Sequence, residues 1–148
     1  MSIDWREDMA TGIENIDNQH KEIFARFALF SDACSDGRGG DELLTLVKFL
    51  AEYTAKHFRE EEETLVGAEY PQLAAQMKAH ASFLDDFIRL RGLVDEHPPG
   101  LEIILNEKRA MIQRLINHIC HMDRAFAAFL TSTRHQPLTP IPPEPVRN

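Results

Sequence analysis

Cysteine is scarce in this sequence, because Cys34 and Cys120 are the only two among 148 residues. Two cysteines are too few for a disulfide framework, so the expected setting is a reducing cytoplasm. No apolar run approaches the ~20 residues of a membrane-spanning helix, and the first residues lack the charged-then-apolar order of a signal segment. Positive charge is also in deficit, with 16 Lys and Arg against 24 Asp and Glu and a net charge of −8. That balance argues against nucleic acid and against an anionic membrane surface as partners.

Segments with the alternating pattern of a β-strand are also missing. Apolar residues instead recur every three or four positions, which is typical of amphipathic helices. Gly and Pro clusters divide this pattern into four expected helices, at about 17–36, 41–66, 71–95 and 101–131. The short connections favour an all-α fold, an antiparallel up-down-up-down four-helix bundle with an extended N-terminal arm. The predicted organisation is an arm over 1–16, a bundle over 17–134 and a Pro-rich tail over 135–148 that is disordered or extended.

Local signals predict how these elements begin. Residues 1–16 lack helical periodicity, which is why an extended arm is expected there. Asp17 is predicted to cap the first helix and Asp41 the second. Pro71 is expected near the first position of the third helix, where its missing N–H costs nothing. The apolar residues expected to hold the arm against the bundle are Ile3, Trp5 and Ile13.

Histidines lie on the apolar faces of all four expected helices. His57 and Glu61 are four residues apart, so on a helix they point to one side, one turn apart. The same side carries Leu50 and Tyr53, so the histidine and the carboxylate extend a buried stripe. The other helices place their histidines similarly: His20, His80 and His118. A rise of ~1.5 Å per residue, counted from the turns of an antiparallel bundle, brings all four to similar depth.

A metal site explains this convergence better than four separate core histidines do. Imidazole and carboxylate ligands without thiolate suit iron, manganese, zinc or copper more than magnesium or calcium. Four histidines and two acids exceed the needs of a single tetrahedral zinc, whereas two carboxylate-bridged metals account for the surplus. Glu61 faces the stripe. Asp123 lies five residues after His118, about 140° round an ideal helix, so an irregular turn or a sideways reach must bring it in.

Four motifs in this order resemble the hemerythrin family, specifically its bacterial single-domain branch, over about residues 3–130. They are Asp17-x-Gln19-His20-Lys21, His57-x-x-x-Glu61, Tyr70-Pro71 followed by His80, and His118-x-x-x-x-Asp123. The family's bundle is itself a standard example of up-down-up-down topology. The resemblance implies two iron ions, as Fe2+ or Fe3+, joined by an oxo or hydroxo bridge, and a function in binding O2.

The resemblance also implies a role for each ligand. The implied metal ligands are His20, His57, Glu61, His80, His118 and Asp123. Glu61 and Asp123 would bridge the irons. His20 and His57 would hold the iron that takes O2, and the other two histidines would hold the second iron.

Two positions depart from the family pattern. Gln76 stands where the family has a histidine one turn before His80, and it could bind weakly, hydrogen-bond a coordinated water or leave a vacant position. His121 occupies a position that in the family lines the O2 pocket and is usually aliphatic. One hypothesis is that His121 ligates an iron or donates a hydrogen bond to bound O2, and the alternative is that it faces solvent. Phe24 and Phe83 are expected in the core and pocket wall.

The predicted function is O2 binding at a non-haem di-iron site, for transport, storage or sensing. An alternative is a di-iron redox enzyme of the peroxidase or NO- or peroxide-reducing type, made possible by Gln76. A second alternative is a signalling module in which O2 or redox state shifts the N-terminal arm and a protein partner reads the change. A non-enzymatic O2-binding protein is the favoured reading among these.

Overall fold

The computed structural model describes residues 5–96 and 100–135, and within them every regular element is a helix. The four long elements predicted from the sequence are present. They are α1 (Glu14–Ser35), α2 (Gly40–Gly67), α3 (Leu73–Val94) and α4 (Leu101–His118), the last continuing through η2 (Ile119–Asp123) into α5 (Arg124–His135). A short 3₁₀ helix, η1 (Glu7–Met9), precedes them.

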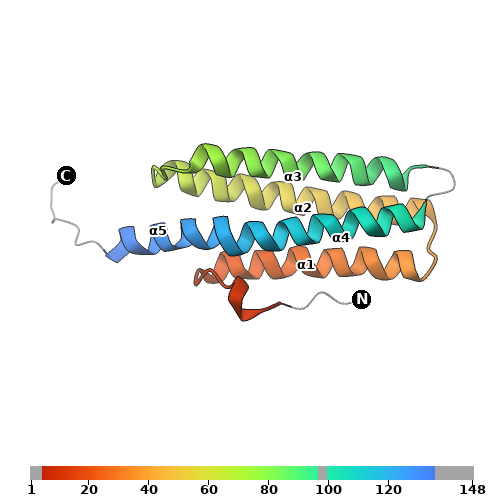
Figure 1. The fold of residues 1–148 in the computed structure, drawn as a ribbon, viewed down its shortest axis with the longest axis horizontal. Helices are drawn as coiled ribbons and strands as arrows, with labels where there is room; N and C mark the ends of the chain where they lie inside the picture. The colour runs from red at the N-terminus through yellow and green to blue at the C-terminus, as the bar shows by residue number, and fades with distance from the viewer. Residues whose placement is uncertain (1–4, 97–99, 136–148) are drawn as a thin grey trace.

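The helices form the antiparallel up-down-up-down bundle that the sequence predicts. Each long helix packs against the next in the chain, and α1 packs against α4, which closes the bundle. Figure 1 shows the four axes running side by side, with α5 continuing the line of α4 beyond the ends of its neighbours. The termini of consecutive helices are joined by short connections, so each helix must reverse direction.

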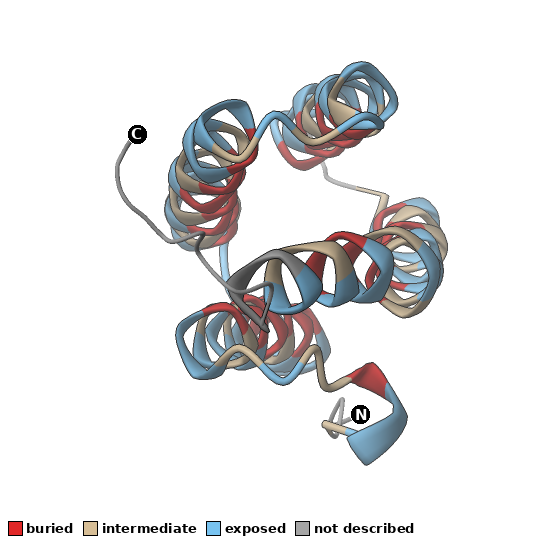
Figure 2. Cartoon of the chain, turned by 90° about the vertical axis from the view of Figure 1, so that its left-hand side faces the viewer, coloured by how far each residue is buried: buried red, intermediate tan, exposed pale blue. Residues whose placement is uncertain are grey.

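The core of the bundle follows from the spacing of buried residues. On α2 the buried positions recur alternately after four and three residues, which is the seam of a left-handed bundle. These positions are Leu43, Val47, Leu50, Thr54, His57 and Glu61. Figure 2 shows, end-on, that the buried residues of all the long helices face the centre. The site residues His57 and Glu61 therefore occupy core positions, as expected.

Gly37 lies just after the end of α1 and adopts a backbone conformation that favours glycine. Its φ of +71° lies in the left-handed region, where a side chain would be strained. That conformation lets the N–H of Arg38 donate to the carbonyl of Ala33, which would otherwise lack a helical partner. Gly37 therefore reverses the chain between α1 and α2.

The N-terminal arm differs from the prediction. Residues 7–9 form a 3₁₀ turn, and α1 begins at Glu14, so Asp17 lies inside the helix and does not cap it. Asp17 instead accepts hydrogen bonds from the N–H and hydroxyl of Thr11, both at 2.8 Å, and from the N–H of Gly12 at 3.3 Å. The Asp17 carboxylate therefore stabilises the turn before α1 and does not cap the helix.

The arm is nevertheless held against the bundle by apolar residues, as predicted. Trp5 packs on Phe24 with 6.5 Å between ring centroids, and Ile13 joins a small apolar cluster at the end of the bundle. Met9 is fully buried and was missed, because a single methionine in a polar stretch carries no periodic signal. Ile3 lies outside the described residues.

The start of α2 was predicted slightly too late and the start of α3 slightly too early. The residue before α2 is Gly39, so Asp41 sits in the first turn and is not the cap. α3 begins at Leu73, so Pro71 belongs to the preceding turn. The tail was expected over 135–148, but α5 extends to His135, and the rest of the expected tail lies outside the described residues.

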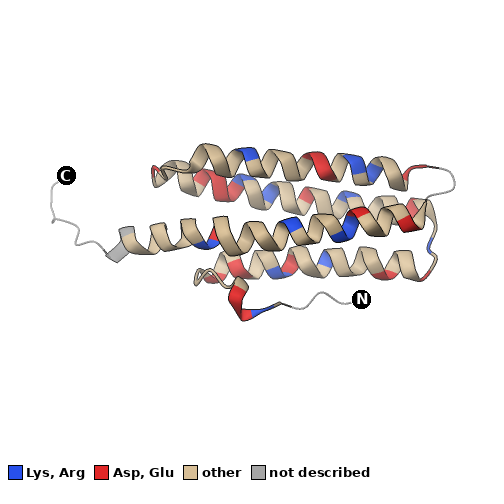
Figure 3. Cartoon of the chain, viewed as in Figure 1, with Lys and Arg blue, Asp and Glu red and all other residues tan. Residues whose placement is uncertain are grey.

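Most charged residues of the described chain are exposed or half-buried, and the buried exceptions are Glu61, Asp86, Lys108 and Asp123. Figure 3 shows acidic residues spread over several helices, with a cluster near the C-terminal end of α2 that corresponds to Glu60–Glu63. Within the described part of the chain, no helix combines the length and hydropathy needed to cross a membrane. Both cysteines are free thiols, Cys34 buried and Cys120 partly buried.

Candidate metal centre

Six side chains predicted as metal ligands come together inside the bundle. They form two sets in which the ligand atoms lie within 4.8 Å of one another: His20, His57 and Glu61, and His80, His118 and Asp123. Five of the six residues are buried, and His118 is partly exposed. Because each of the four helices contributes a histidine at matched depth, the antiparallel topology itself builds the site.

Asp123 reaches the site through an irregular turn. Residues Ile119–Asp123 form a single π-helical turn, in which residues five apart share one face. An Oδ1 atom of Asp123 therefore lies 3.0 Å from Nε2 of His118. On a regular α-helix the side chains of His118 and Asp123 would lie about 140° apart around the axis. The extra residue in the π-helical turn brings them to the same face. This is the irregularity that the sequence required.

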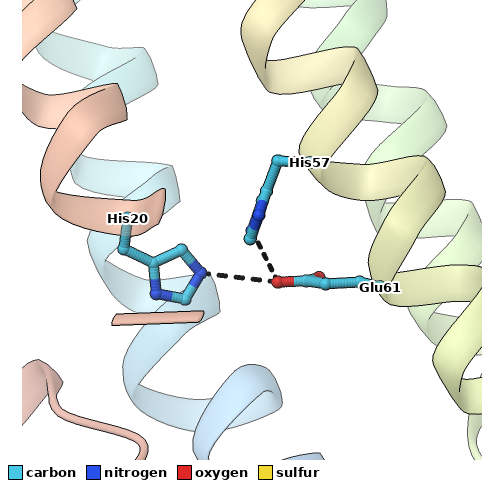
Figure 4. Close-up of side chains that lie close together, drawn as sticks. All are labelled: His20, His57 and Glu61. Carbon is cyan, nitrogen blue, oxygen red and sulfur yellow. Dashed lines mark ion pairs between the residues drawn. The ribbon is translucent and has the colours of Figure 1, made fainter. Parts of the chain in front are cut away.

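The first set joins α1 to α2. Figure 4 shows His20 and His57 converging on one oxygen of Glu61. The Oε2 atom of Glu61 lies 2.6 Å from Nε2 of His57 and 3.5 Å from Nε2 of His20. The i,i+4 spacing of His57 and Glu61 fixes the first of these contacts within α2.

Both carboxylates face both sets of residues. The second oxygen of Glu61, Oε1, lies 3.2 Å from Nε2 of His80. Asp123 does the reverse, with Oδ2 3.1 Å from Nε2 of His20 and Oδ1 directed at His118. Each acid therefore offers one oxygen to each histidine pair, which is the arrangement required of two carboxylates that bridge two cations.

Outer hydrogen bonds orient two of the histidines. The Nδ1 atom of His57 lies 2.5 Å from Oε1 of Gln19, and Nδ1 of His80 lies 2.7 Å from Oε2 of Glu62. With Nδ1 donating its proton outward, Nε2 is left with its lone pair facing the site. Gln19 is itself held by Glu60, to which its amide donates at 3.0 Å.

Sequence reasoning missed these outer partners. The sequence singled out only Glu61 among the acids at 60–63, but Glu60 accepts a hydrogen bond from Gln19 and Glu62 accepts one from His80. The signal for Gln19 was its position beside His20 in a quoted motif. Nothing local marks Glu62, because its partner His80 lies on the neighbouring helix.

The electrostatics of the cluster favour a cation. Burial lowers the pKa of His20, but the carboxylates of Asp123 and Glu61 outweigh burial and raise that pKa to about 9. Burial raises the pKa of the Glu61 carboxyl, but His20, His57 and His80 hold it well below its usual range. Two anionic carboxylates buried side by side need compensating positive charge, and a proton on His20 supplies part of it in the absence of a metal.

Buried atoms without hydrogen bonds test whether a metal fits. Within the described residues they include both ring nitrogens of His20, Nε2 of His57 and both carboxylate oxygens of Glu61. The contacts of Glu61 with His57 at 2.6 Å and with His20 at 3.5 Å are hydrogen bonds only if Nε2 carries a proton, so a neutral His57 whose Nδ1 donates outward leaves both Nε2 and the oxygen unsatisfied. Leaving a buried polar group unsatisfied costs roughly 1–3 kcal/mol, so natural sites rarely retain several together. Nε2 of His20, Nε2 of His57 and both oxygens of Glu61 face other members of the cluster and are potential ligands. The donor set therefore fits a pair of cations with nitrogen and oxygen ligands.

Gln76 lies inside the cluster, one turn before His80 on α3. Its side chain is 1% exposed, and Nε2 donates to Oδ1 of Asp123 at 2.6 Å. The same nitrogen lies 3.3 Å from Nε2 of His118 and 3.5 Å from Nε2 of His80. Turning the amide over would place its oxygen against an anionic oxygen of Asp123, so the nitrogen is the favoured atom at this contact. Gln76 thus occupies the expected ligand position while acting as a hydrogen-bond donor.

The remaining predicted residues lie around the cluster. His121 is exposed and lines a cavity of about 400 Å³ beside His80 and His118, and Phe83 lines the same cavity. Phe24 is buried against Trp5 and is not among the residues that line it. Phe58 was not predicted as a wall residue, yet its ring stacks on His80 with centroids 3.8 Å apart and 7° between planes.

Comparison with known proteins agrees with this geometry. Residues 11–130 match the family model described as the hemerythrin HHE cation binding domain. The chain is 31% identical over 132 residues to a bacteriohemerythrin of Pseudomonas paraeruginosa, covering 88% of this chain and 81% of that protein. It is 32% identical over 126 residues to a bacteriohemerythrin of Stenotrophomonas maltophilia, covering 83% and 78%. A myohemerythrin of Sipunculus nudus is 34% identical over 89 residues, covering 60% and 66%. The chain belongs to the hemerythrin family.

Proposed function

We propose that this protein holds two iron ions and binds O2 reversibly, for delivery, storage or sensing in the cytoplasm. The observation that carries the proposal is that Glu61 and Asp123 each direct one oxygen to each pair of histidines. That arrangement suits two bridged metals of the same kind. Two ferrous ions held there would each supply one electron to O2 and would regain it when O2 is released.

The protein's own residues supply three further requirements. Glu61 and Asp123 fix the separation of the two metal positions, and the outward hydrogen bonds of His57 and His80 hold the imidazoles in place. Burial keeps bulk water from His20 and His57, which are 1% and 2% exposed, and Phe58 covers one face of His80. Iron as the metal and O2 as the ligand are supported by the family to which the chain belongs.

The proposal is tested by iron loading under anaerobic conditions followed by cycles of air and argon. We expect about two irons per chain and a visible absorption band that appears with O2 and disappears under argon. A Glu61→Ala variant should lose both iron and colour, whereas Glu63→Ala, an exposed acid on the same helix, should retain them. Irreversible oxidation at the first exposure to air would contradict reversible O2 binding.

A second candidate function is a di-iron redox enzyme acting on peroxide or NO. The observation in its favour is the cavity of about 400 Å³ that reaches His80 and His118, together with the donor role of Gln76 in place of a ligand. An accessible metal position permits turnover that a closed site prevents. Sustained consumption of hydrogen peroxide with an added reductant would support the enzyme, and a long-lived O2 adduct without such turnover would support the carrier.

A further inference from the structure

A cavity of about 400 Å³ lies between α3 and the α4–η2 segment. Its inner wall includes His80 and His118, and its apolar sides include Phe58 and Phe83. Its outer wall includes Ser82 and His121, both exposed, so the cavity reaches the surface of the bundle. A molecule entering it from solvent therefore meets the second histidine pair directly.

The other half of the site is more enclosed. His20 and His80 are both 1% exposed and His57 is 2% exposed, so the two halves differ in the cavity beside them and in His118, whose side chain is 12% exposed. The space beside Glu61 on that side is about 50 Å³ and is lined by Glu61, Gln19 and Phe126, with neither histidine in its wall. A volume of this size holds about one or two waters and gives no open approach to His20 or His57.

Gln76 leaves the accessible half with few ligands. Its amide nitrogen, not its oxygen, faces Asp123, and an amide N–H cannot coordinate a metal. A metal at His80 and His118 would therefore have two imidazoles and one oxygen from each carboxylate. The cavity is lined by His80 and His118, the two imidazoles of this half, while Gln76 is not among its lining residues.

The charges around the cavity are balanced. Arg114 lines it, but its guanidinium is paired with Asp86 at 2.9 Å and with Glu107 at 3.3 Å. The wall therefore offers no free cation to select a multiply charged ligand. The combination of apolar sides and paired charges suits neutral molecules or monoanions of two or three atoms.

We propose that small exogenous ligands of this class enter through the α3–α4 cavity and bind at the metal held by His80 and His118. The inference rests on the proposed two-iron site and deepens it. It differs from what the resemblance to the family implied, which placed the ligand on the iron held by His20 and His57. The difference follows from this chain's own cavity and from Gln76.

The test uses azide, a linear monoanion of three atoms, added to the diferric protein and followed by its absorption change. Ser82→Trp places an indole at the exposed mouth of the cavity and should slow azide binding about tenfold, equivalent to about 1.4 kcal/mol of added barrier. The matched control is Ala81→Trp, the adjacent exposed residue on α3, which is not among the residues lining the cavity and should leave the rate within about twofold of the parent rate.

A second variant identifies the metal that receives the ligand. Gln76→His supplies an imidazole to the His80–His118 half and should weaken azide binding by about tenfold or more, because the vacant position is filled. Iron content is measured for every variant. Loss of iron in the parent would overturn the two-iron function itself. Full iron content with unchanged azide kinetics and affinity in Ser82→Trp and Gln76→His would overturn both the entry route and the assignment of the ligand to this metal, and would leave the two-iron function standing. If Gln76→His does not fold, as judged by circular dichroism, equal azide binding rates for Ser82→Trp and Ala81→Trp would overturn the proposal.

Discussion

Glu62 differs from the acids beside it because its carboxylate reaches across to another helix. It accepts a hydrogen bond of 2.7 Å from Nδ1 of His80, while Glu63 is exposed to solvent. Single residues of this kind decide how well the site is formed without touching a metal. Their effect comes through the orientation and basicity of the imidazole that they hold.

Replacing Glu62 with alanine should therefore weaken metal binding at the accessible half. The expected loss is about 10- to 100-fold in affinity, the usual effect of removing a hydrogen-bond partner of a ligating histidine. Competition with a coloured chelator measures the affinity. Glu62→Gln keeps an acceptor oxygen and should recover most of the loss, and Glu63→Ala should change little. Equal affinities for all three variants would show that Glu62 does not orient His80.

Lys108 is the least explained charged residue of the described core. It is 4% exposed and has no hydrogen bond or ion pair among the described residues. Burial, together with the nearby charge of Arg109, lowers the pKa of Lys108 from its ordinary value of 10.5. Lys108 lines a small cavity with Ser35 and Arg109, and partial burial of its ammonium without a paired anion costs free energy that an apolar side chain of similar length would not.

Lys108→Met should therefore stabilise the protein at neutral pH by roughly 1 kcal/mol. Between the lowered pKa of the folded state and 10.5, the unfolded chain binds more protons than the folded chain. The stability of the parent therefore rises with pH in that window, and the advantage of Lys108→Met shrinks toward pH 10.5. Urea unfolding at neutral and at alkaline pH measures both values, and an advantage that grows with pH would contradict this account.

The convergence of the candidate ligand residues could be predicted from sequence because helical spacing determines which side chains share a face. His57 and Glu61 needed only a period of 3.6 residues, and matched depth in an antiparallel bundle added the other histidines. Contacts between helices could not be predicted in the same way. Gln19 and Glu62 depend on the rotation of neighbouring helices, which no local pattern specifies.

At the scale of elements, the π-turn from Ile119 to Asp123 connects the fold to the site. The sequence predicted one continuous fourth helix, and the structure keeps that direction while adding one residue to one turn. Helix ends were the weaker part of the prediction. Asp17 is of a residue type that favours the N-cap, but its carboxylate accepts hydrogen bonds from the N–H groups of Thr11 and Gly12. The helix therefore begins before it, at Glu14.

If the π-turn is an α-helix with one inserted residue, removing one residue should restore a regular helix. Deleting His121 changes His118-x-x-x-x-Asp123 to the four-residue spacing that His57 and Glu61 already use. Both acids would still face the site, so about two metals per chain are expected. Deleting Arg114, an exposed residue in the regular part of α4, should instead rotate His118 and Asp123 by about 100° relative to the preceding turn and abolish metal binding. Metal analysis of folded protein distinguishes these outcomes, and loss of both metals on deleting His121 would contradict the insertion model.

At the scale of the whole molecule, the stability of the bundle depends on the candidate metal site at its centre. Four helices meet at a cluster of imidazoles and carboxylates that an ordinary core would fill with apolar residues. Without metal, the charge of the two buried carboxylates is balanced by protons on neighbouring imidazoles such as His20, whose pKa the carboxylates raise to about 9. Metal binding should therefore link all four helices and strengthen the bundle as a unit.

Removing the metal should accordingly lower the temperature of unfolding. A ligand present at 100 times its Kd stabilises the folded state by about 2.7 kcal/mol. For a chain of this size, 1 kcal/mol shifts the midpoint by roughly 2–4 °C, so a decrease of roughly 5–10 °C is expected on treatment with a chelator. Differential scanning calorimetry before and after chelation measures the change, and His57→Ala, which lacks one ligand of the first set, should show a much smaller difference. An equal midpoint for loaded and chelated parent protein would show that the helices do not depend on the metal, and the coupling between site and fold would be refuted.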